Sequence, residues 1–583
     1  MKTSRTCLGA TKITFEFRAG FAVFGFAIVV LTLMPFPLNG AQYYTNWAAA
    51  HFSDIPAQSG PLADPDGDGE PNVVEFAFGT DPRVGGGIAG AVQPLYGGVN
   101  GTNAVFQVEI LEREGHQPGV QIDLYLSARL TNWTNWFRPW WLRTTTNSLP
   151  SDPAGSVREL FTTRLPGTNI WFVRPKVQLF EGGAETANYY VATNGSDATT
   201  NSGTSINAPF ATLGKAAGLA TNGNLVYVRG GVYPTSSKIS FTKISVAGQP
   251  IRIRAYPGET PVLDFSAEAG GTDGIAISGN YYWLYGLVFT NAGHNSIAIT
   301  GTNNIIERCV SLGARNTGFH IGGGSSATSK AASNLFLNCD SIRNYDPAGN
   351  GGDADGFAAK WSIGTGNVFS GCRAWENSDD GWDLWMGTSG VLITNCWAFR
   401  NGTNILGLVP FKGNGNGFKL GGNNVGAAHT LVCSLSFHNM GTNGCNGIDQ
   451  NNNTLGQTVD QNTSWGNLKA NFSLKHGANT TPHVVRNNVS FAGGSSDAFT
   501  SGTLSTNNSW DVVSPTVNTD DFLTVDESFA VAPRRDDGGL PETPFSRPVP
   551  GGRLVDKGVK VGIPSYPFYG SAPDLGNFET PMW

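Results

Sequence analysis

Residues 372–385, CRAWENSDDGWDLW, place three aspartates within five positions among large aromatic side chains. The stretch combines two short patterns that recur through the second half of the chain. The first is Ser or Ala, an apolar residue, any residue and Asn, and its copies end at Asn344, Asn377, Asn401, Asn439 and Asn467. The second is Gly or Asn followed by an apolar residue, and its copies are TGFHI, DGFAA, DGWDL, NGFKL, NGIDQ and ANFSL, which begin at positions 317, 355, 380, 416, 446 and 470.

The spacing of these patterns predicts a parallel β-helix. Successive asparagines of the first pattern are 33, 24, 38 and 28 residues apart. Each coil of a parallel β-helix has three short strands and three turns, and only the turns absorb insertions. Equivalent positions then stack at about 4.8 Å, so the repeated Asn should form an internal ladder. Four cysteines at equivalent positions should form a buried column rather than disulfides, and they are Cys309, Cys339, Cys372 and Cys396.

Stacking of the coils also predicts which polar residues meet. Alignment of the second pattern puts one set of residues in a column, namely Asp355, Asp380, Asn416 and Asn446. A second column lies three residues further on and contains His320, Ala358, Asp383, Lys419, Asp449 and Ser473. Asp355, Asp379, Asp380 and Asp383 should therefore share a surface patch with Lys419. Four carboxylates so close together require a cation, and an all-oxygen cluster favours Ca²⁺.

The same residues resemble a known family. The segments DADGFAAK, GNVFSGCRAWENSDDGWDLW and GNGFKLGG, with the opening YYVATNGSD and the closing SAPDLGNFE, are similar to family 9 polysaccharide lyases. These are secreted enzymes with a right-handed parallel β-helix, and they include pectate lyases. The resemblance covers residues 188–583 and implies calcium ligation by Asp355, Asp379, Asp380 and Asp383. It also implies that Lys419 is the general base and that the substrate is pectate (polygalacturonate) or a related uronic-acid polymer.

The chemistry of β-elimination fits these residue types. Cleavage of a 4-linked uronate by this route removes the C5 proton, which is α to the carboxylate of the sugar. A cation that binds this carboxylate stabilises the enolate-like intermediate and acidifies C5. A lysine beside the cation should have a lowered pKa, which suits it to act as a base, most of all at alkaline pH.

Four further cations are weaker candidates for contacts with substrate carboxylates, and an ordinary surface position is the simpler reading of each. They are Lys360, Lys412, Lys475 and Arg343. The two longest insertions, after Asn344 and Asn401, are expected to wall a cleft. The tryptophans of the opening stretch, Trp375, Trp382 and Trp385, are expected to pack in the helix or line that cleft.

Two other functions are compatible with the fold. A polygalacturonase-like glycoside hydrolase would use Asp379 and Asp380 as acid and base without a metal. A non-catalytic β-helix adhesin would use calcium for stability alone. The third and fourth aspartates and the stacked lysine favour the lyase.

The chain before the β-helix contains three further segments. Residues 1–41 have a basic lead and an apolar run, which predicts a signal peptide and a secreted, periplasmic or cell-surface protein that leaves the membrane once the signal is removed. Residues 42–86 contain DPDGDGEPNVVE, an EF-hand-like spacing similar to dockerin-like loops, with an acidic linker as the alternative. Its candidate ligands for a second, structural calcium are Asp64, Asp66, Asp68, Glu70, Asn72 and Glu75.

Residues 87–184 alternate apolar and polar positions in short runs, which predicts a small antiparallel β domain. The all-β chain of 583 residues carries a net charge of −7 and has a pI near 5.7, which argues against nucleic acid as a partner. We expect a monomer.

Overall fold

The structure is a computed structural model that describes residues 187–323, 330–475, 480–535, 538–541, 544–561, 568 and 570–580. Before residue 187 it describes eight strands and a few separate positions. The chain divides into two compact units, one of residues 1–185 with 580–583 and one of residues 186–579. Among the described residues, no helix is long and apolar enough to cross a membrane.

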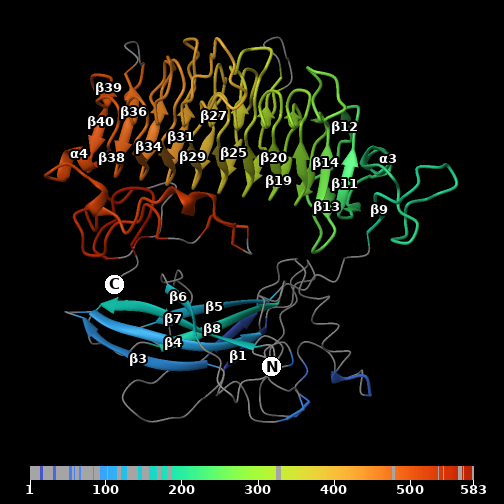
Figure 1. The fold of residues 1–583 in the computed structure, drawn as a ribbon, viewed down its shortest axis with the longest axis horizontal. Coiled ribbons are helices and arrows are strands. Elements are labelled where there is room, and N and C mark those ends of the chain that lie inside the picture. Colours follow the sequence, from blue (N-terminus) through green and yellow to red (C-terminus); the bar gives the residue numbers. More distant parts are fainter. Residues whose placement is uncertain are drawn as a thin grey trace. The chain divides into compact units, whose positions relative to one another are not determined.

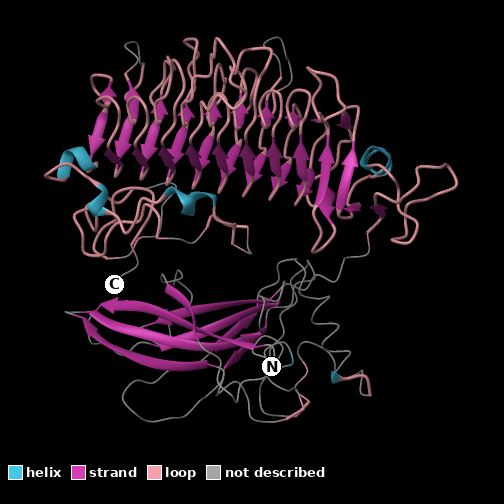
Figure 2. Cartoon of the chain, in the orientation of Figure 1, coloured by secondary structure: helices cyan, strands magenta, loops and turns pink. Residues whose placement is uncertain are grey.

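Three parallel sheets build the second unit, which is a right-handed β-helix (Figures 1 and 2). Sheet 1 contains twelve strands, β9 (Tyr189–Val191), β10 (Leu225–Val228), β13 (Ile251–Ala255), β16 (Tyr282–Tyr285), β19 (Ile305–Glu307), β22 (Leu335–Leu337), β25 (Val368–Ser370), β28 (Leu392–Thr394), β31 (Thr430–Val432), β34 (Thr458–Asp460), β37 (Val484–Arg486) and β40 (Leu504–Thr506). Sheet 2 contains ten, β11 (Gly231–Pro234), β14 (Pro261–Asp264), β17 (Val288–Thr290), β20 (Val310–Leu312), β23 (Asp340–Ile342), β26 (Arg373–Trp375), β29 (Trp397–Phe399), β32 (Leu435–Phe437), β35 (Thr463–Trp465) and β38 (Val489–Phe491). Sheet 3 contains ten, β12 (Ile239–Phe241), β15 (Ile275–Ile277), β18 (Ile297–Ile299), β21 (Phe319–Ile321), β24 (Phe357–Ala359), β27 (Trp382–Asp383), β30 (Phe418–Lys419), β33 (Ile448–Asp449), β36 (Phe472–Leu474) and β39 (Ala498–Phe499).

The core of the solenoid is a set of stacked aromatic and aliphatic side chains. Trp382 is fully buried and lies between Phe357 and Phe418, with ring centroids 4.7 and 4.8 Å away. These three residues occupy the same register on β24, β27 and β30. Rings that stack from coil to coil keep large apolar side chains in contact along the interior of the solenoid. Trp382 is therefore a core residue and does not line the surface.

The predicted asparagine ladder is confirmed. The backbone N–H of Asn344 donates to Asn377 Oδ1 over 3.1 Å, and Asn377 donates in the same way to Asn401. Asn401 and Asn439 continue the series as far as Asn467. All five side chains are buried, and the amides pair with backbone groups of the preceding coil that would otherwise be unpaired, as when Asn377 donates to Ser341 O and accepts from Asn344 N–H. The predicted cysteine column is also confirmed, because all four of its thiols are buried and free.

A buried ion cluster ties the C-terminal segment to sheet 2. This segment contains α4 (Ser509–Val512), η4 (Thr519–Asp521) and η5 (Glu527–Val531). Arg534 follows η5, and its guanidinium donates to both carboxylate oxygens of Asp340, which begins β23. Arg373 on the next coil binds the same carboxylate over 2.9 and 2.8 Å and also donates to the carbonyls of Ala530 and Ala532. The Asp340 cluster thus has two guanidinium groups around one carboxylate.

The remaining elements are one helix of the solenoid and the strands of the first unit. The helix α3 (Leu213–Leu219) lies at the N-terminal end of the solenoid, buries three apolar residues and is capped by Thr212. The first unit contains the antiparallel pairs expected for residues 87–184, in sheets ordered β3-β4-β7-β6 and β5-β8. Its strands are β1 (Ile13–Glu16), β2 (Val30–Leu33), β3 (Val92–Asn100), β4 (Asn103–Arg113), β5 (Val120–Ser127), β6 (Leu142–Thr146), β7 (Ser156–Pro166) and β8 (Phe172–Leu179).

The predicted signal and calcium loop lie largely outside the described residues. Of the signal, only the backbone of β1 and β2 is described. Of the six candidate ligands in residues 42–86, only Asp66 and Asn72 are described. The structure therefore leaves both predictions as they stand.

Candidate active site

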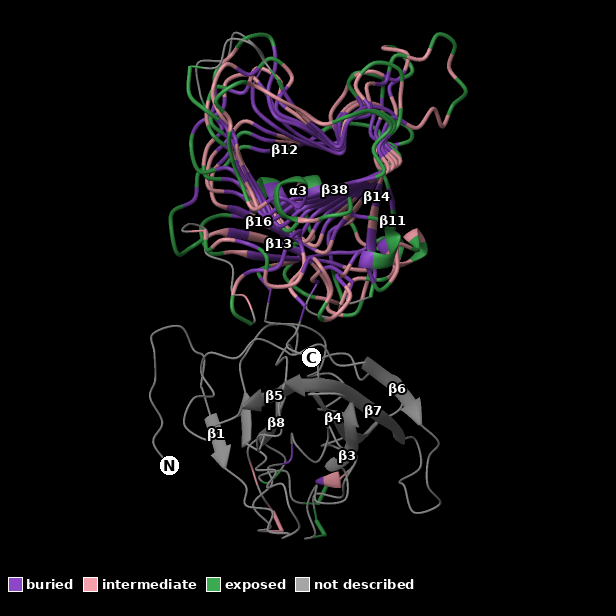
Figure 3. Cartoon of the chain, turned by 90° about the vertical axis from the view of Figure 1, so that its left-hand side faces the viewer, coloured by how far each residue is buried: buried purple, intermediate pink, exposed green. Residues whose placement is uncertain are grey.

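The two predicted columns exist, and they meet on sheet 3. Strand register pairs His320 with Ala358, Ala358 with Asp383, Asp383 with Lys419 and Lys419 with Asp449. Inward neighbours of Asp383 and Lys419 are the core residues Trp382 and Phe418, so period-two alternation turns the two charged side chains outward. Viewed along the solenoid, loops rise beyond sheet 3 on both of its sides (Figure 3).

Hydrogen bonds join the other column from coil to coil. The backbone N–H of Asp380 donates to Asp355 Oδ1 over 3.2 Å. Asn416 donates its backbone N–H to Asp380 Oδ1 over 2.6 Å and its side-chain amide to the same oxygen over 2.9 Å. The backbone N–H of Asn446 donates in turn to Asn416 Oδ1. Asp355 and Asp380 therefore replace asparagine in a ladder that elsewhere needs no charge.

Three carboxylates converge where the columns meet. One oxygen each of Asp355, Asp380 and Asp383 lies within 4.8 Å of the others, and all three side chains are buried. Lys419 Nζ lies 3.1 Å from Asp380 Oδ2 and 3.3 Å from Asp383 Oδ2. Lys419 is 7 % exposed, so its ammonium group is held in the cluster.

Lys360 belongs to the same cluster, which corrects the expectation that it is an ordinary surface cation. Its side chain is 5 % exposed, and its Nζ lies 2.8 Å from Asp355 Oδ2 and 2.7 Å from Asp383 Oδ2. Lys360 follows β24 directly, two positions after Ala358, and reaches across to the next coil. Its charge is used within the cluster, so it is not a free contact for a substrate carboxylate.

Asp379 lies beside the converging carboxylates but is held by loops. Its Oδ2 accepts the backbone N–H of Asp353 over 2.9 Å, and its Oδ1 accepts that of Asn414 over 2.5 Å. These donors come from the two long insertions, which contact each other where Lys412 N–H donates to Asn350 O. Both insertions connect sheet 2 to sheet 3, so they form one wall on the same side of sheet 3. Asp379 fixes that wall against the carboxylates.

The charges shift the pKa values of the cluster strongly. Burial, with the repulsion between neighbouring carboxylates, raises the pKa values of Asp355, Asp379 and Asp380 to about 7. Burial acts on Asp383 in the same direction, but Lys360 and Lys419 outweigh it and hold the pKa of Asp383 below its usual value. Burial favours neutral lysine, yet the carboxylates raise the pKa values of Lys360 and Lys419 above the ordinary lysine range.

The residues present fit a hard divalent cation. Asp380 Oδ2 is buried, lies next to an ammonium group and accepts no hydrogen bond. Four carboxylates face two ammonium groups, so when all are ionised the cluster carries an excess charge of −2 that one Ca²⁺ would cancel. The site offers oxygen ligands only, which is the donor set that Ca²⁺ requires.

The other tryptophans and candidate cations have separate positions. Trp375 lies on sheet 2, where its ring stacks on Phe399 at 5.5 Å. Trp385 follows β27 and is partly exposed, two positions after Asp383. Arg343 is an exposed partner of Glu376 over 2.7 Å. Lys412 and Lys475 are exposed, the first on an insertion and the second just after β36.

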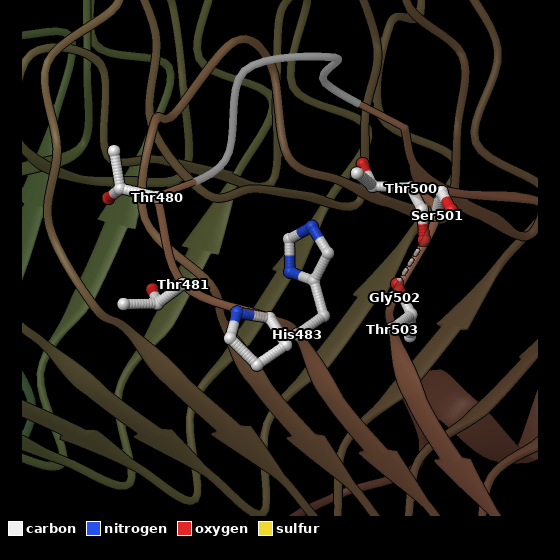
Figure 4. A pocket seen from close by; sticks show the side chains of 8 residues that line it. Thr480, Thr481, His483, Thr500, Ser501, Gly502 and Thr503 are labelled. Atoms are coloured by element: carbon white, nitrogen blue, oxygen red, sulfur yellow. Dashed lines mark hydrogen bonds between the residues drawn. The ribbon is translucent and has the colours of Figure 1, made fainter.

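A separate pocket of about 340 Å³ lies at the C-terminal coils and has no acid–base chemistry (Figure 4). Its lining is mostly hydroxyl-bearing and contains Thr480, Thr481, Pro482, His483, Thr500, Ser501, Gly502 and Thr503. Burial lowers the pKa of His483 to about 4, and its two ring nitrogens contact Gln457 N–H and Gln450 Oε1. The imidazole is therefore neutral and structural.

The chain is thus a right-handed β-helix protein with a buried lysine–carboxylate cluster on sheet 3. A family model described as "Pel9A-like, right handed beta helix region" matches residues 189–497, and the chain belongs to this family. The chain is therefore a polysaccharide lyase.

Relatives of known activity support this assignment. The chain is 40% identical over 404 residues to pectate lyase L of Dickeya chrysanthemi, an alignment that covers 67% of this chain and 90% of the relative. It is 32% identical over 402 residues to pectate lyase PEL9 of Emericella nidulans, covering 63% and 93%. The crystal structure of pectate lyase Pel9A matches with a TM-score of 0.59 and 37% identity, over 67% of this chain and 96% of that one. A rhamnogalacturonan lyase matches with a TM-score of 0.52 and 27% identity, covering 62% and 96%.

Sequence reasoning missed two features of the site. The bridging position of Lys360 had a partial signal, because alternation along β24 turns Lys360 outward together with Ala358, toward Asp383 on the next coil. Trp361 had none, because it lies in a turn outside both repeated patterns. It follows Lys360 and contacts the rings of His320 and Trp385.

Proposed function

We propose that this chain is a calcium-dependent lyase that cleaves 4-linked galacturonan, the polymer named pectate, by β-elimination. The observation that carries the proposal is the convergence of three buried carboxylates on a lysine in the next coil. Relatives named pectate lyase, at 40% and 38% identity, support pectate as the substrate.

The residues of the cluster divide the work of the reaction. Asp355, Asp380 and Asp383 would hold the cation, with Asp379 beside them fixing the insertion wall. Bound Ca²⁺ supplies the positive charge that binds the uronate carboxylate and stabilises the negative charge that develops as C5 loses its proton. Lys419 Nζ takes the C5 proton, and the electrons left at C5 form the C4–C5 double bond as the C4–O bond breaks. The departing glycosidic oxygen takes up a proton from water and becomes the hydroxyl of the new reducing end. The product is an unsaturated uronate at the new non-reducing end.

The protonation state of Lys419 depends on the charge around it. Burial acts to lower the pKa of Lys419, but the four carboxylates around it raise that pKa, whereas the sequence predicts a lowered pKa beside a cation. The same carboxylates are the candidate metal ligands. The predicted low pKa of Lys419 therefore belongs to the cation-loaded site, where the negative charge is neutralised.

Polygalacturonate with and without a chelator tests the proposal directly. We expect products that absorb in the ultraviolet, formed with added Ca²⁺ and abolished by EDTA, since the unsaturated bond is conjugated with the carboxylate. Lys557→Ala is the control for Lys419→Ala, because this exposed lysine lies in the C-terminal segment outside the cluster. Saturated reducing ends that persist in EDTA would instead identify a hydrolase, and no cleavage of any uronate would favour an adhesin.

A second substrate deserves a place in the same assay. The solved structure that matches with a TM-score of 0.52 is named a rhamnogalacturonan lyase. Rhamnogalacturonan and homogalacturonan should therefore be compared at equal uronate concentration. Faster release of unsaturated ends from rhamnogalacturonan would reassign the substrate and leave the role of Lys419 intact.

We also propose that the protein is exported and that residues 42–86 bind a structural calcium. The basic and apolar lead of residues 1–41 supports export, and the EF-hand-like spacing supports the second site. N-terminal sequencing of protein from the culture medium tests the first proposal. Calcium titration of Asp68→Ala tests the second, which expects one bound ion fewer than in the unaltered chain.

A further inference from the structure

Three aromatic rings on consecutive coils form a wall next to the lysine–carboxylate cluster. His320 lies on β21, Trp361 follows β24, and Trp385 follows β27. The ring centroids of His320 and Trp361 are 5.7 Å apart at 70°, and those of Trp361 and Trp385 are 6.1 Å apart at 82°. Each ring thus meets the next edge-to-face. We call these three residues the aromatic wall.

Two residues of the wall adjoin the lysine–carboxylate cluster. Trp361 is the neighbour of Lys360, and the backbone N–H of Trp385 donates to Asp383 Oδ1 over 2.9 Å. His320 shares the outward column of Asp383 and Lys419. Coils are spaced at about 4.8 Å, which is close to the advance of one pyranose ring along a polysaccharide. A sugar chain that follows the solenoid axis would therefore meet Trp361 and Trp385 with successive units.

The backbone beside Trp385 leaves room for its ring. Trp361 has a φ of 56°, the left-handed turn conformation that Met386 also adopts one coil later. Gly422 has a φ of 158°, and a Cβ there would lie 2.1 Å from Trp385 Cδ1. A side chain on the coil of Lys419 would displace Trp385, so glycine at this position gives the ring its place.

Burial and charge distinguish the wall from the core aromatics. Trp361 and Trp385 are partly exposed, whereas Trp382 and Trp397 are fully buried. Burial lowers the pKa of His320 to about 3, so its ring is neutral at any working pH. An uncharged wall has no attraction for uronate carboxylates. Trp361 and Trp385 offer partly exposed apolar surface to the C–H faces of sugar rings, and the buried ring of His320 packs against Trp361.

We infer that the aromatic wall is a sugar-binding subsite that stacks on the pyranose rings next to the uronate that reacts at Lys419. The inference rests on the proposed function, because it takes the cluster as the point of cleavage. The cluster and the aromatic wall would bind different parts of the substrate. The cluster recognises the carboxylate of one sugar, and the wall recognises the ring faces of its neighbours whatever their substituents.

Binding to an inactive enzyme tests the subsite apart from catalysis. In a Lys419→Ala background, Trp361→Ala and Trp385→Ala should each weaken the binding of oligogalacturonate by about tenfold, as expected for one lost stacking contact of about 1.4 kcal/mol. Trp361→Phe and Trp385→Phe should restore most of the affinity, because they keep an aromatic face. Trp283→Ala is the matched control, since this partly exposed tryptophan lies on sheet 1.

Kinetics of the active enzyme provide the second readout. Trp385→Ala should raise KM for polygalacturonate about tenfold with kcat changed less than threefold, and it should lengthen the products. Unchanged affinity, KM and product length in the Trp361→Ala, Trp385→Ala double variant would overturn the subsite while lyase activity stands. Absence of unsaturated products from the unaltered enzyme would overturn the proposed function instead, and binding to the Lys419→Ala protein would still report on the wall.

Discussion

The β-helix contains two buried charge clusters with opposite balance. At the Asp340 cluster one carboxylate meets two guanidinium groups, from Arg373 and Arg534, and every charge has a partner. Those guanidinium groups hold the pKa of Asp340 below its usual value although burial acts to raise it. At the candidate active site four carboxylates meet two ammonium groups, and three of them have pKa values raised to about 7. The first cluster has an excess of positive charge and the second an excess of carboxylate, which a bound cation would neutralise.

The residue types follow the same division. Arginine binds both oxygens of a carboxylate in a fixed plane and keeps its proton, so it suits a permanent cluster. Lysine is a point charge whose pKa responds to its surroundings, so it suits a cluster that exchanges protons. Balance of charge, rather than burial alone, separates a structural cluster from a functional one in this molecule.

Lys419→Ala should have the largest effect. Without the base, we expect the rate of unsaturated product formation to fall about a thousandfold. The unfolding temperature and the calcium affinity should stay close to those of the unaltered protein, because Asp355, Asp380 and Asp383 remain. A variant with more than a tenth of the original rate would show that another group takes the proton.

Asp340→Ala should be the most destabilising of these changes while leaving the chemistry intact. It leaves two guanidinium groups buried without a counter-charge, which costs about 3 kcal/mol of the free energy of unfolding. Chemical denaturation measures this loss. The calcium requirement and KM of the folded fraction should match those of the unaltered protein, and a changed calcium requirement would contradict the separation of the two clusters.

Lys360→Met should destabilise only the calcium-free protein. Removal of the bridging ammonium leaves Asp355 and Asp383 to repel each other, at a cost of about 2 kcal/mol of unfolding free energy. Excess calcium should restore stability, and calorimetric titration should show tighter calcium binding because a competing positive charge is gone. Equal destabilisation with and without calcium would mean that Lys360 acts only as packing.

Asp380→Asn should stabilise the calcium-free protein. The amide keeps the oxygen that accepts from Asn416 and removes one charge from a cluster with too many, for a gain of about 1 kcal/mol at pH 8. The increase in unfolding temperature on addition of calcium should then shrink or vanish. A loss of stability without calcium would contradict the charge excess.

The two clusters should give pH dependences of opposite sign. The carboxyl groups of Asp355, Asp379 and Asp380 bind protons more tightly in the folded than in the unfolded state, so calcium-free stability should fall as pH rises from about 4 to 7. The contribution of Asp340 is present above the unfolded pKa near 4 and is lost as pH falls further. Unfolding temperatures from pH 3 to 8, with and without calcium, separate the two. Calcium should raise the unfolding temperature by several degrees more at pH 8 than at pH 5.

The repeat explains why so much of the site follows from sequence. The recurring Asn and Gly units set the register of a parallel β-helix. The sequence alone therefore predicts that Asp383 and Lys419 lie side by side, as the strand register confirms. The reach of Lys360 across to Asp383 depends on side-chain conformation and was not predicted. Asp379 was grouped with the other aspartates, but its hydrogen bonds depend on how two insertions pack, which no period describes.

In the Asp340 cluster, the ion pair between Asp340 and Arg534 joins residues that are 194 positions apart in the sequence. A chain that is synthesised from its N-terminus contains Asp340 long before Arg534 is made. Until then only Arg373 can neutralise this carboxylate, and sheet 2 lacks the segment that covers it. Completion of the fold is therefore tied to the arrival of the last eighth of the chain, so an interrupted polypeptide would contain every residue of the candidate active site and still present an unfinished surface to proteases.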